Sequence, residues 1–268
     1  MNNKSIGVFD SGLGGLTAVK SILSLMPGEN IIYFGDTARI PYGTKTEETI
    51  KQYAASDIRF LLSKDVKLIV IACGTASSVA LGDMRDMFDT PVVGVVEAAS
   101  TAAVRKSKNG KIGVIGTGAT IKSGSYLRAI KEINSDIEVY HNACPLFVPL
   151  VENGHFDTEV TRLVVREYLE EIKNSGVDTL ILGCTHYPLL EKAIGDYMGS
   201  GVELISPSFE LAKSLPEILG KENLADSKKP GEVSYYVSDD VEGFSRLGGV
   251  FLEKEICGMV QKIDIEKY

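Results

Sequence analysis

The sequence repeats one strand-and-turn pattern, and this repeat restricts the possible folds more than any other feature. Ile6–Gly12 aligns with Ile112–Gly118, and Val66–Cys73 aligns with Val177–Cys184 at a similar offset. The aligned segments are apolar and rich in β-branched residues, and amphipathic stretches separate them, as in α/β proteins with parallel strands. We therefore predict two pseudo-symmetric α/β domains with mainly parallel sheets and an active site in the cleft between them.

The apolar runs and the helical periodicity give the expected elements. Strands are predicted at 5–9, 30–34, 68–72, 92–96, 111–115, 138–140, 179–182, 203–205 and 234–237. Helices are predicted at 15–25, 46–62, 123–133 and 157–173, with Ser123 and Asp157 as N-caps of the last two. A polar loop is predicted at 221–231, and residues 244–250 are expected to help complete the first domain.

Composition excludes several classes of partner. The 28 basic and 36 acidic residues give a net charge of −8, so no basic footprint for nucleic acid or an anionic membrane is present. No apolar run approaches the ~18 residues of a membrane span. The N-terminus runs directly into a strand, and the four cysteines form no CxxC pair. We therefore expect a cytoplasmic protein with reduced thiols.

Ligands of parallel sheets bind beyond the carboxyl ends of the strands. Two facing domains would bring Asp10, Cys73, Thr117 and Cys184 to one cleft. A single buried cysteine is usually inert, but two at equivalent positions favour chemistry. Each lies where the N–H groups of a following helix would lower a thiol pKa.

Two opposed thiols suit the inversion of a carbon centre. One group removes a proton from one face while the other delivers a proton to the opposite face, so the two ionisation states are coupled. A disulfide between Cys73 and Cys184 is the competing interpretation. Asp10 and His186 lie near these turns and could assist a thiol or bind an ammonium group. They could instead be a helix N-cap and a structural hydrogen-bonding group.

Other motifs are incomplete. Asp10–Gly15 lacks the full dinucleotide fingerprint, and Gly116–Ser123 lacks the second glycine of a P-loop. His141 and Cys144 form a lone HxxC, which does not indicate zinc. Cys144 and Cys257 are interpreted as structural.

Taken together, the turns resemble the glutamate racemase family of the aspartate/glutamate racemase superfamily. The matching segments are FDSGLGGLT at 9–17, FGDTARIPYG at 34–43, IACGTAS at 71–77, GVIGTGATIKSGSY at 113–126, CPLFVPLVENG at 144–154 and LGCTHYPLL at 182–190. The resemblance implies cofactor-independent racemisation of glutamate that supplies D-glutamate for peptidoglycan. It also implies that no metal is used and that the protein is a homodimer.

The resemblance also implies roles for individual residues. Cys73 would remove the α-proton of the D-isomer, and Cys184 that of the L-isomer. The substrate-binding residues would be Asp10, Ser11, Tyr42, Gly43, Gly74, Thr75, Thr185 and His186. The first domain would comprise residues 1–97 and 208–268, and the second residues 98–207.

Two positions depart from the family pattern, and Gly74 is the more important. The family normally has asparagine where this chain has Gly74, and proline is common at Ala98. Loss of the asparagine's hydrogen bonds would cost about 1–3 kcal/mol, so we expect weaker substrate binding with intact two-thiol chemistry. A Gly74→Asn variant is expected to raise kcat/KM.

Two other functions are compatible with the sequence. A related racemase of different specificity, isomerase or decarboxylase would share the fold, although a decarboxylase can function with one cysteine. A non-catalytic protein that binds an amino acid in the cleft would leave the paired thiols without a role.

Overall fold

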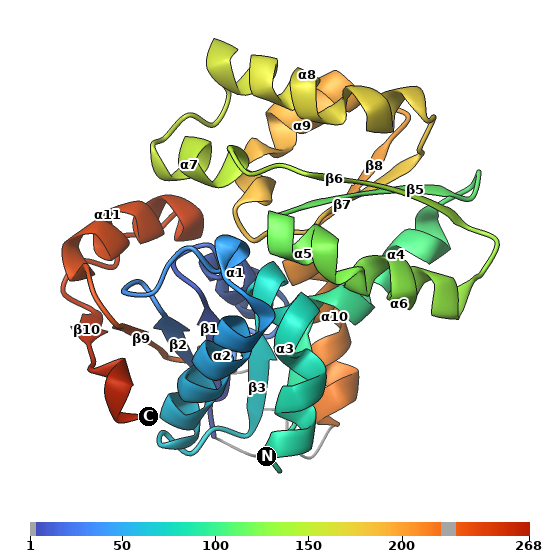
Figure 1. Cartoon of the computed structure of the whole chain (residues 1–268). Helices are drawn as coiled ribbons and strands as arrows, with labels where there is room; N and C mark the ends of the chain where they lie inside the picture. Colours follow the sequence, from blue (N-terminus) through green and yellow to red (C-terminus); the bar gives the residue numbers. More distant parts are fainter. Residues whose placement is uncertain (1–3, 221–228) are drawn as a thin grey trace.

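Two fully parallel sheets form the centre of the molecule in the computed structural model, which describes residues 4–220 and 229–268 (Figure 1). The first sheet has the strand order β10-β9-β2-β1-β3-β4, and the second has the order β6-β5-β7-β8. The strands are β1 (Ile6–Asp10), β2 (Ile31–Gly35), β3 (Leu68–Ile71), β4 (Val92–Gly94), β5 (Lys111–Gly116), β6 (Glu138–Ala143), β7 (Thr179–Leu182), β8 (Glu203–Ile205), β9 (Val233–Val237) and β10 (Val260–Lys262). The predicted fold class is confirmed.

The two sheets share one topology. β1 lies between β2 and β3, just as β5 lies between β6 and β7, and each series continues to a short fourth strand. The chain returns to the first sheet at its end, where β9 pairs with β2 from Ile31↔Val233 to Gly35↔Val237. The internal repeat in the sequence therefore corresponds to a repeat in structure.

Helices cover the sheets, and those expected from periodicity at 15–25, 46–62, 123–133 and 157–173 are present with shifted bounds, whereas the others were not predicted. They are α1 (Leu16–Leu25), α2 (Glu47–Leu62), α3 (Gly74–Met87), α4 (Val95–Lys106), α5 (Gly118–Ser123), α6 (Ser125–Ile133), α7 (Phe147–Glu152), α8 (Glu159–Asn174), α9 (Glu191–Met198), α10 (Pro207–Leu219) and α11 (Val241–Leu252). The 3₁₀ turns among the described residues are η1 (Tyr42–Thr44), η2 (Tyr187–Leu190) and η4 (Ile265–Lys267).

Some expected boundaries were wrong for local reasons. The helix expected at 123–133 is two helices, because Gly124 takes a left-handed φ of 65° between them, and Gly124 rather than Ser123 is the N-cap. Thr158 rather than Asp157 caps α8, since its hydroxyl accepts the N–H of Thr161. The strand expected at 92–96 ends at Gly94, where α4 begins. Residues 244–250 lie in α11, and most of the loop expected at 221–231 lies outside the described residues.

Burial on both faces explains why the sequences of the central strands are continuous runs of apolar residues. Every residue of β1, β3 and β7 is buried, because helices cover both faces of each sheet. One apolar cluster includes side chains from both halves, among them Ile6, Val70, Leu180 and Tyr187. The two sheets are therefore joined by a shared core, and the carboxyl ends of their central strands face one interdomain space.

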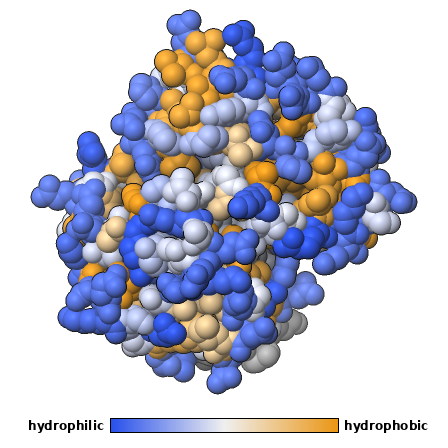
Figure 2. All heavy atoms as spheres, viewed as in Figure 1, coloured by the Kyte–Doolittle hydropathy of each residue, from blue (hydrophilic) through white to orange (hydrophobic). Residues whose placement is uncertain are grey.

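Hydrophilic residues cover most of the face seen in Figure 2, with smaller patches of hydrophobic residues among them. Within the described part of the chain, none of the helices combines the length and the apolar composition that crossing a membrane requires.

Candidate active site

A cavity of about 390 Å³ lies between the two sheets, at the carboxyl ends of their strands. Its volume falls within the range of small-molecule sites. Every predicted site residue except Asp10 lines it: Ser11, Tyr42, Gly43, Cys73, Gly74, Thr75, Cys184, Thr185 and His186. The turns after β1, β3 and β7, far apart in the sequence, thus meet at one site.

Cys73 occupies the first of the two cysteine turns, between β3 and α3. It is the N-cap of α3, and its Sγ accepts the N–H of Ala76 at 3.5 Å. The thiol lies 3.6 Å from Ser11 Oγ. Burial and the neighbouring Asp10 raise the pKa of Cys73 to about 12, against the lowering effect of the helix N–H group. The expected lowering is therefore wrong for Cys73 in the substrate-free protein.

Cys184 follows β7 and has a different charged environment. Its Sγ lies 3.8 Å from His186 Nδ1, and His186 Nε2 lies 3.2 Å from Glu152 Oε1. Burial lowers the pKa of His186, but its hydrogen bonds with Cys184 and Glu152 outweigh this effect and raise the pKa to about 10. A protonated imidazole therefore lies beside Cys184, whereas a carboxyl group lies near Cys73.

The two thiols are free and buried, and they interact electrostatically with each other. The disulfide alternative therefore has no support in this structure.

Asp10 lies directly behind the cavity wall and is fully buried. Its carboxylate accepts the N–H of Gly12 at 3.4 Å and the hydroxyl of Thr185 at 3.3 Å. Burial raises the pKa of Asp10, and the charge of His186 opposes that rise. Asp10 thus orders the turn after β1 through Gly12 and holds Thr185 in the turn after β7. It therefore has both a local structural role and a role beside the cavity.

Threonine hydroxyls connect the two domains at the opposite side of the cavity. Thr75 Oγ1 lies 2.9 Å from Thr117 Oγ1, which in turn lies 3.0 Å from Thr120 Oγ1. Gly43 packs against the same point, since a Cβ atom there would lie 2.7 Å from Thr117 Cβ. Glycine at 43 is required for this close approach.

Tyr42 lines the cavity, but its hydroxyl is directed into a buried network of charged groups. It donates to Asp36 and lies 3.0 Å from Asp57 Oδ2. Arg39 forms ion pairs with the same two carboxylates, at 2.6 and 2.8 Å. Burial and the adjacent Asp36 raise the pKa of Asp57 well above its ordinary value. The hydroxyl of Tyr42 is thus used to anchor the 40–44 segment.

Gly74 lies where the two cysteine turns touch. A Cβ atom at this position would be 2.3 Å from the carbonyl oxygen of Gly183, and 3.5 Å from Cys184 Cα. Cβ atoms essentially never approach another atom more closely than 3.0 Å. The absence of a side chain at 74 therefore allows the Cys184 turn to pack directly against the Cys73 turn.

Several cavity residues were not identified from the sequence. Glu152, at the end of α7, reaches His186 only through the tertiary fold. Cys144, interpreted as structural, also lines the cavity. An apolar wall is formed by Ile40, Pro41, Pro145, Val148 and Pro149. Most of these residues lie in the segment 144–154, which resembles a motif of the family. That resemblance was the sequence signal that could have identified them as cavity residues.

The arrangement provides two sulfur atoms, an imidazolium–carboxylate pair and several hydroxyl donors around one small cavity. Such a set can move a proton at a carbon atom and can bind the polar groups of an amino acid. Within residues 4–220 and 229–268, no group of three or more His, Cys, Asp or Glu side chains is arranged to hold a metal ion.

The chain is similar to known proteins along almost its whole length. A family model described as Asp/Glu/Hydantoin racemase matches residues 11–215. The glutamate racemase of Geobacter metallireducens is 48% identical over 264 residues, which cover 98% of this chain and 97% of that protein.

Solved structures show the same similarity. The glutamate racemase from Francisella tularensis in complex with D-glutamate has a TM-score of 0.92 and 40% identity, and the match covers 100% of both chains. The glutamate racemase from Thermus thermophilus in complex with beta-chloro-D-alanine has a TM-score of 0.89 and 42% identity, over 99% of each chain.

Proposed function

The chain belongs to the glutamate racemase family, and from this premise we propose that it interconverts L- and D-glutamate by proton transfer between Cys73 and Cys184. The observation that carries this proposal is the pair of free, buried thiols on equivalent turns around one cavity. The complex of a relative with D-glutamate supports glutamate as the substrate. The product D-glutamate would serve peptidoglycan synthesis.

The different surroundings of the two thiols assign the resting state. Burial and Asp10 keep the proton on Cys73, and the protonated imidazole of His186 lies beside Cys184, 3.8 Å from its Sγ. In this state Cys184 removes the α-proton of L-glutamate, and the thiol of Cys73 delivers its proton to the opposite face. The reaction of D-glutamate runs in reverse and begins with Cys73 as the base.

The substrate's own charges assist this exchange. An ammonium group bound between the turns lies near Asp10 and offsets the carboxylate's effect on Cys73. Ser11, Thr75 and Thr185 line the cavity, so their hydroxyls can contact the two carboxylates of glutamate once Thr185 exchanges its hydrogen bond to Asp10 for one to the substrate. Because buried thiols ionise reluctantly, we expect substrate binding and thiol ionisation to be coupled.

The experiment is a circular-dichroism time course of D-glutamate with the purified protein and no added cofactor. The signal of the parent should decay to zero as the racemic mixture forms. Cys73→Ser and Cys184→Ser should each slow this decay by roughly 10²-fold or more, because each removes one acid/base group. Cys257→Ser is the matched control, since Cys257 is exposed and outside the cavity, and it should racemise at the parental rate.

A parent that leaves the signal unchanged, or serine variants that remain fully active, would contradict the proposal. Decay of the signal with release of CO₂ would instead indicate a decarboxylase, because loss of the α-carboxyl group leaves an achiral product. Normal glutamate binding without turnover would indicate a binding protein.

We also propose the domain division 1–97 plus 208–268 and 98–207, which is supported by the return of β9 to the first sheet. A homodimer and a cytoplasmic location follow from the same family membership as proposals. Sedimentation velocity tests the first, and cell fractionation tests the second.

A further inference from the structure

The buried hydroxyl of Tyr42 lies between two carboxyl groups and has only one hydrogen to offer them. It donates to Asp36 Oδ2 and lies 3.0 Å from Asp57 Oδ2. Because a phenol carries a single O–H group, it cannot donate fully to two carboxylate oxygens at once. If Asp57 were ionised, its Oδ2 would face the phenol oxygen without a hydrogen atom of its own between them.

Asp36 is the carboxyl group that has the fuller set of donors. Its Oδ2 accepts Arg39 Nε at 2.6 Å as well as the hydroxyl of Tyr42, and its Oδ1 accepts the hydroxyl of Ser238 at 2.9 Å. Asp57 Oδ1 accepts Arg39 Nη2 at 2.8 Å. Hydrogen bonds to a carboxylate favour its charged form. The negative charge of the pair therefore belongs on Asp36.

The balance of charge in this cluster also places one proton. Asp36 and Asp57 are both fully buried, and Arg39 forms ion pairs with both of them. One guanidinium compensates one carboxylate, and a second buried negative charge would be costly. A proton on Asp57 makes the three groups neutral together. Burial and the adjacent Asp36 raise the pKa of Asp57, in agreement with this count.

The other titratable groups around the cluster do not change this balance. Tyr53 presents its ring to Arg39 at 4.3 Å, and Glu266 of η4 lies 4.0 Å from Arg39 Nη1 and is exposed. Asp10, at the end of β1, accepts the hydroxyl of Thr185 instead. The remaining charged side chains of α2 and those of α3, which packs against it, are exposed or half-buried: Glu47, Glu48, Lys51, Arg59, Asp83, Arg85 and Asp86.

Tyr42 connects this buried cluster to the active site. Residues 40–44 all line the interdomain cavity, and Tyr42 itself is 1% exposed. The next residue, Gly43, packs so closely on the second domain that its Cβ position lies 2.7 Å from Thr117 Cβ. A shift of the Tyr42 hydroxyl would therefore displace one wall of the cavity.

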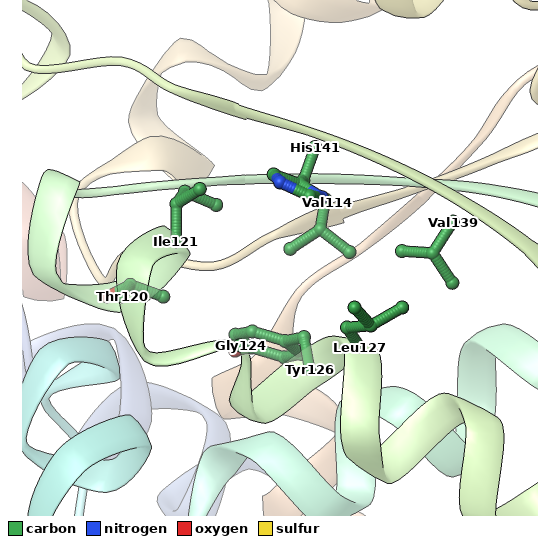
Figure 3. A pocket seen from close by; sticks show the side chains of 8 residues that line it. All are labelled: Val114, Thr120, Ile121, Gly124, Tyr126, Leu127, Val139 and His141. Carbon is green, nitrogen blue, oxygen red and sulfur yellow. The ribbon is translucent and has the colours of Figure 1, made fainter.

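The surface that receives Gly43 is itself well packed. Thr117 Oγ1 lies 3.0 Å from Thr120 Oγ1, and Thr120 lines a small second cavity between the second sheet and helices α5 and α6 (Figure 3). The volume of this cavity, about 30 Å³, has room for one or two water molecules and for no amino acid. The 40–44 wall thus closes against a firm surface, and the hydrogen bonds of Tyr42 set its position.

We propose that Asp57 is a positioning residue for glutamate binding, which holds a proton at neutral pH and donates it to Tyr42, so that the 40–44 wall of the cavity is fixed. The role in binding rests on the proposed racemase function. The presence of the proton does not, and it can be tested without any substrate.

Urea unfolding of the parent and of Asp57→Asn between pH 5 and pH 7 tests the proton. The ordinary pKa of an aspartate is 3.8, so the unfolded chain has released this proton in that range, whereas the folded chain keeps it on Asp57. As the pH rises, the parent should therefore lose stability relative to Asp57→Asn, by about 10-fold in the unfolding constant per pH unit. Asp83→Asn, which changes an exposed aspartate of α3, is the matched control. Its difference from the parent should stay constant.

The kinetics of each enantiomer test the positioning role. Asp57→Asn should keep the parental KM, because its amide N–H can donate to Tyr42 and its amide oxygen can accept from Arg39. Asp57→Ala should raise KM roughly 3- to 10-fold, the effect of one lost hydrogen bond. Its kcat should stay close to the parental value, since Cys73 and Cys184 lie on other turns. In a Tyr42→Phe background, Asp57→Ala should raise KM no further, because both changes act through the same hydroxyl.

Two results would overturn the inference. A constant difference in stability between the parent and Asp57→Asn would show that Asp57 is ionised. A parental KM in Asp57→Ala, or an Asp57→Asn variant whose KM rises as far as that of the alanine variant, would show that Asp57 does not position the wall. If the alanine variant fails to fold, the asparagine variant still decides both points. The activity of the parent on glutamate is measured first, so failure of the proposed function is distinguished from failure of this inference.

Discussion

A single methyl group at residue 74 should push the Cys184 turn away from the Cys73 turn and slow the proposed proton transfer. In Gly74→Ala the new Cβ atom would lie 2.3 Å from the carbonyl oxygen of Gly183, and this oxygen must retreat to at least 3.0 Å. Because the carbonyl directly precedes Cys184, the retreat should move the sulfur of Cys184 away from that of Cys73, and the proposed reaction requires both sulfurs at one α-carbon. A misplacement approaching 1 Å costs about 10²-fold in rate, or roughly 2.7 kcal/mol of barrier.

The assay is kcat and KM for each enantiomer by circular dichroism, together with urea unfolding. Gly74→Ala should lower kcat about 10²-fold in both directions and destabilise the fold by about 1–3 kcal/mol, as overpacking does. Gly82→Ala, on the same helix α3, is the control. A Cβ atom there meets nothing within 4 Å, so this variant should gain about 0.5–1 kcal/mol and keep parental kinetics. Parental kinetics in Gly74→Ala would refute the reasoning.

The same contact changes how Gly74→Asn is interpreted. The sequence alone predicts a gain in kcat/KM from the asparagine, but the structure adds the cost of its Cβ atom. Comparison with Gly74→Ala separates the two effects, because both variants carry that atom. The amide should make the asparagine variant about 5- to 150-fold better than the alanine variant. Equal kinetics in the two would mean that the amide does not contact substrate.

Two further perturbations test the charged groups around the site. Folding raises the pKa of His186 from 6.5 to about 10, so its protonation stabilises the fold fully below pH 6.5, and this contribution is lost as the pH rises through 10. The difference in free energy of unfolding between the parent and His186→Asn should therefore shrink over that range in urea titrations, and a constant difference would contradict this assignment. Arg39→Ala should destabilise the protein by about 3–5 kcal/mol, because it leaves the carboxylates of Asp36 and Asp57 buried without their cation. Urea unfolding at pH 7 measures this loss, and a change below 1 kcal/mol, as for exposed ion pairs, would show that the network does not depend on Arg39.

The strands could be predicted because covered parallel sheets produce long apolar runs. β7 and β8 were placed at their observed bounds, and β1 to within one residue at each end. Helices α3 and α4, like α7, α9, α10 and α11, were not predicted. α3 and α4 are rich in alanine, serine and threonine and carry little amphipathic contrast. These small side chains allow the helices to pack closely between the two domains.

The cavity lining was largely predictable, but the direction of individual side chains was not. The repeat brought Cys73 and Cys184 to one cleft, as expected. The hydroxyl of Tyr42 is directed toward Asp36 and Asp57, and Glu152 approaches His186 from another helix. Both facts depend on tertiary contacts that no spacing in the sequence encodes.

The electrostatic expectation for Cys73 failed for a physical reason. A helix N-terminus lowers a thiol pKa, but complete burial and a nearby carboxylate raise it more in this cavity. The position of Cys73 directly after a strand indicated a nearby helix N-terminus, but the sequence does not show how deeply the thiol is buried.

The central claim is that two thiols act on opposite faces of one α-carbon. L-Glutamate incubated with the protein in D₂O and stopped at low conversion tests it most directly, with mass spectrometry of each enantiomer after separation. Two bases predict that the D-glutamate formed carries solvent deuterium at Cα while the recovered L-glutamate keeps its original proton. D-Glutamate that retains the original proton, or L-glutamate that acquires deuterium as fast as the product forms, would require a single base and would contradict the account.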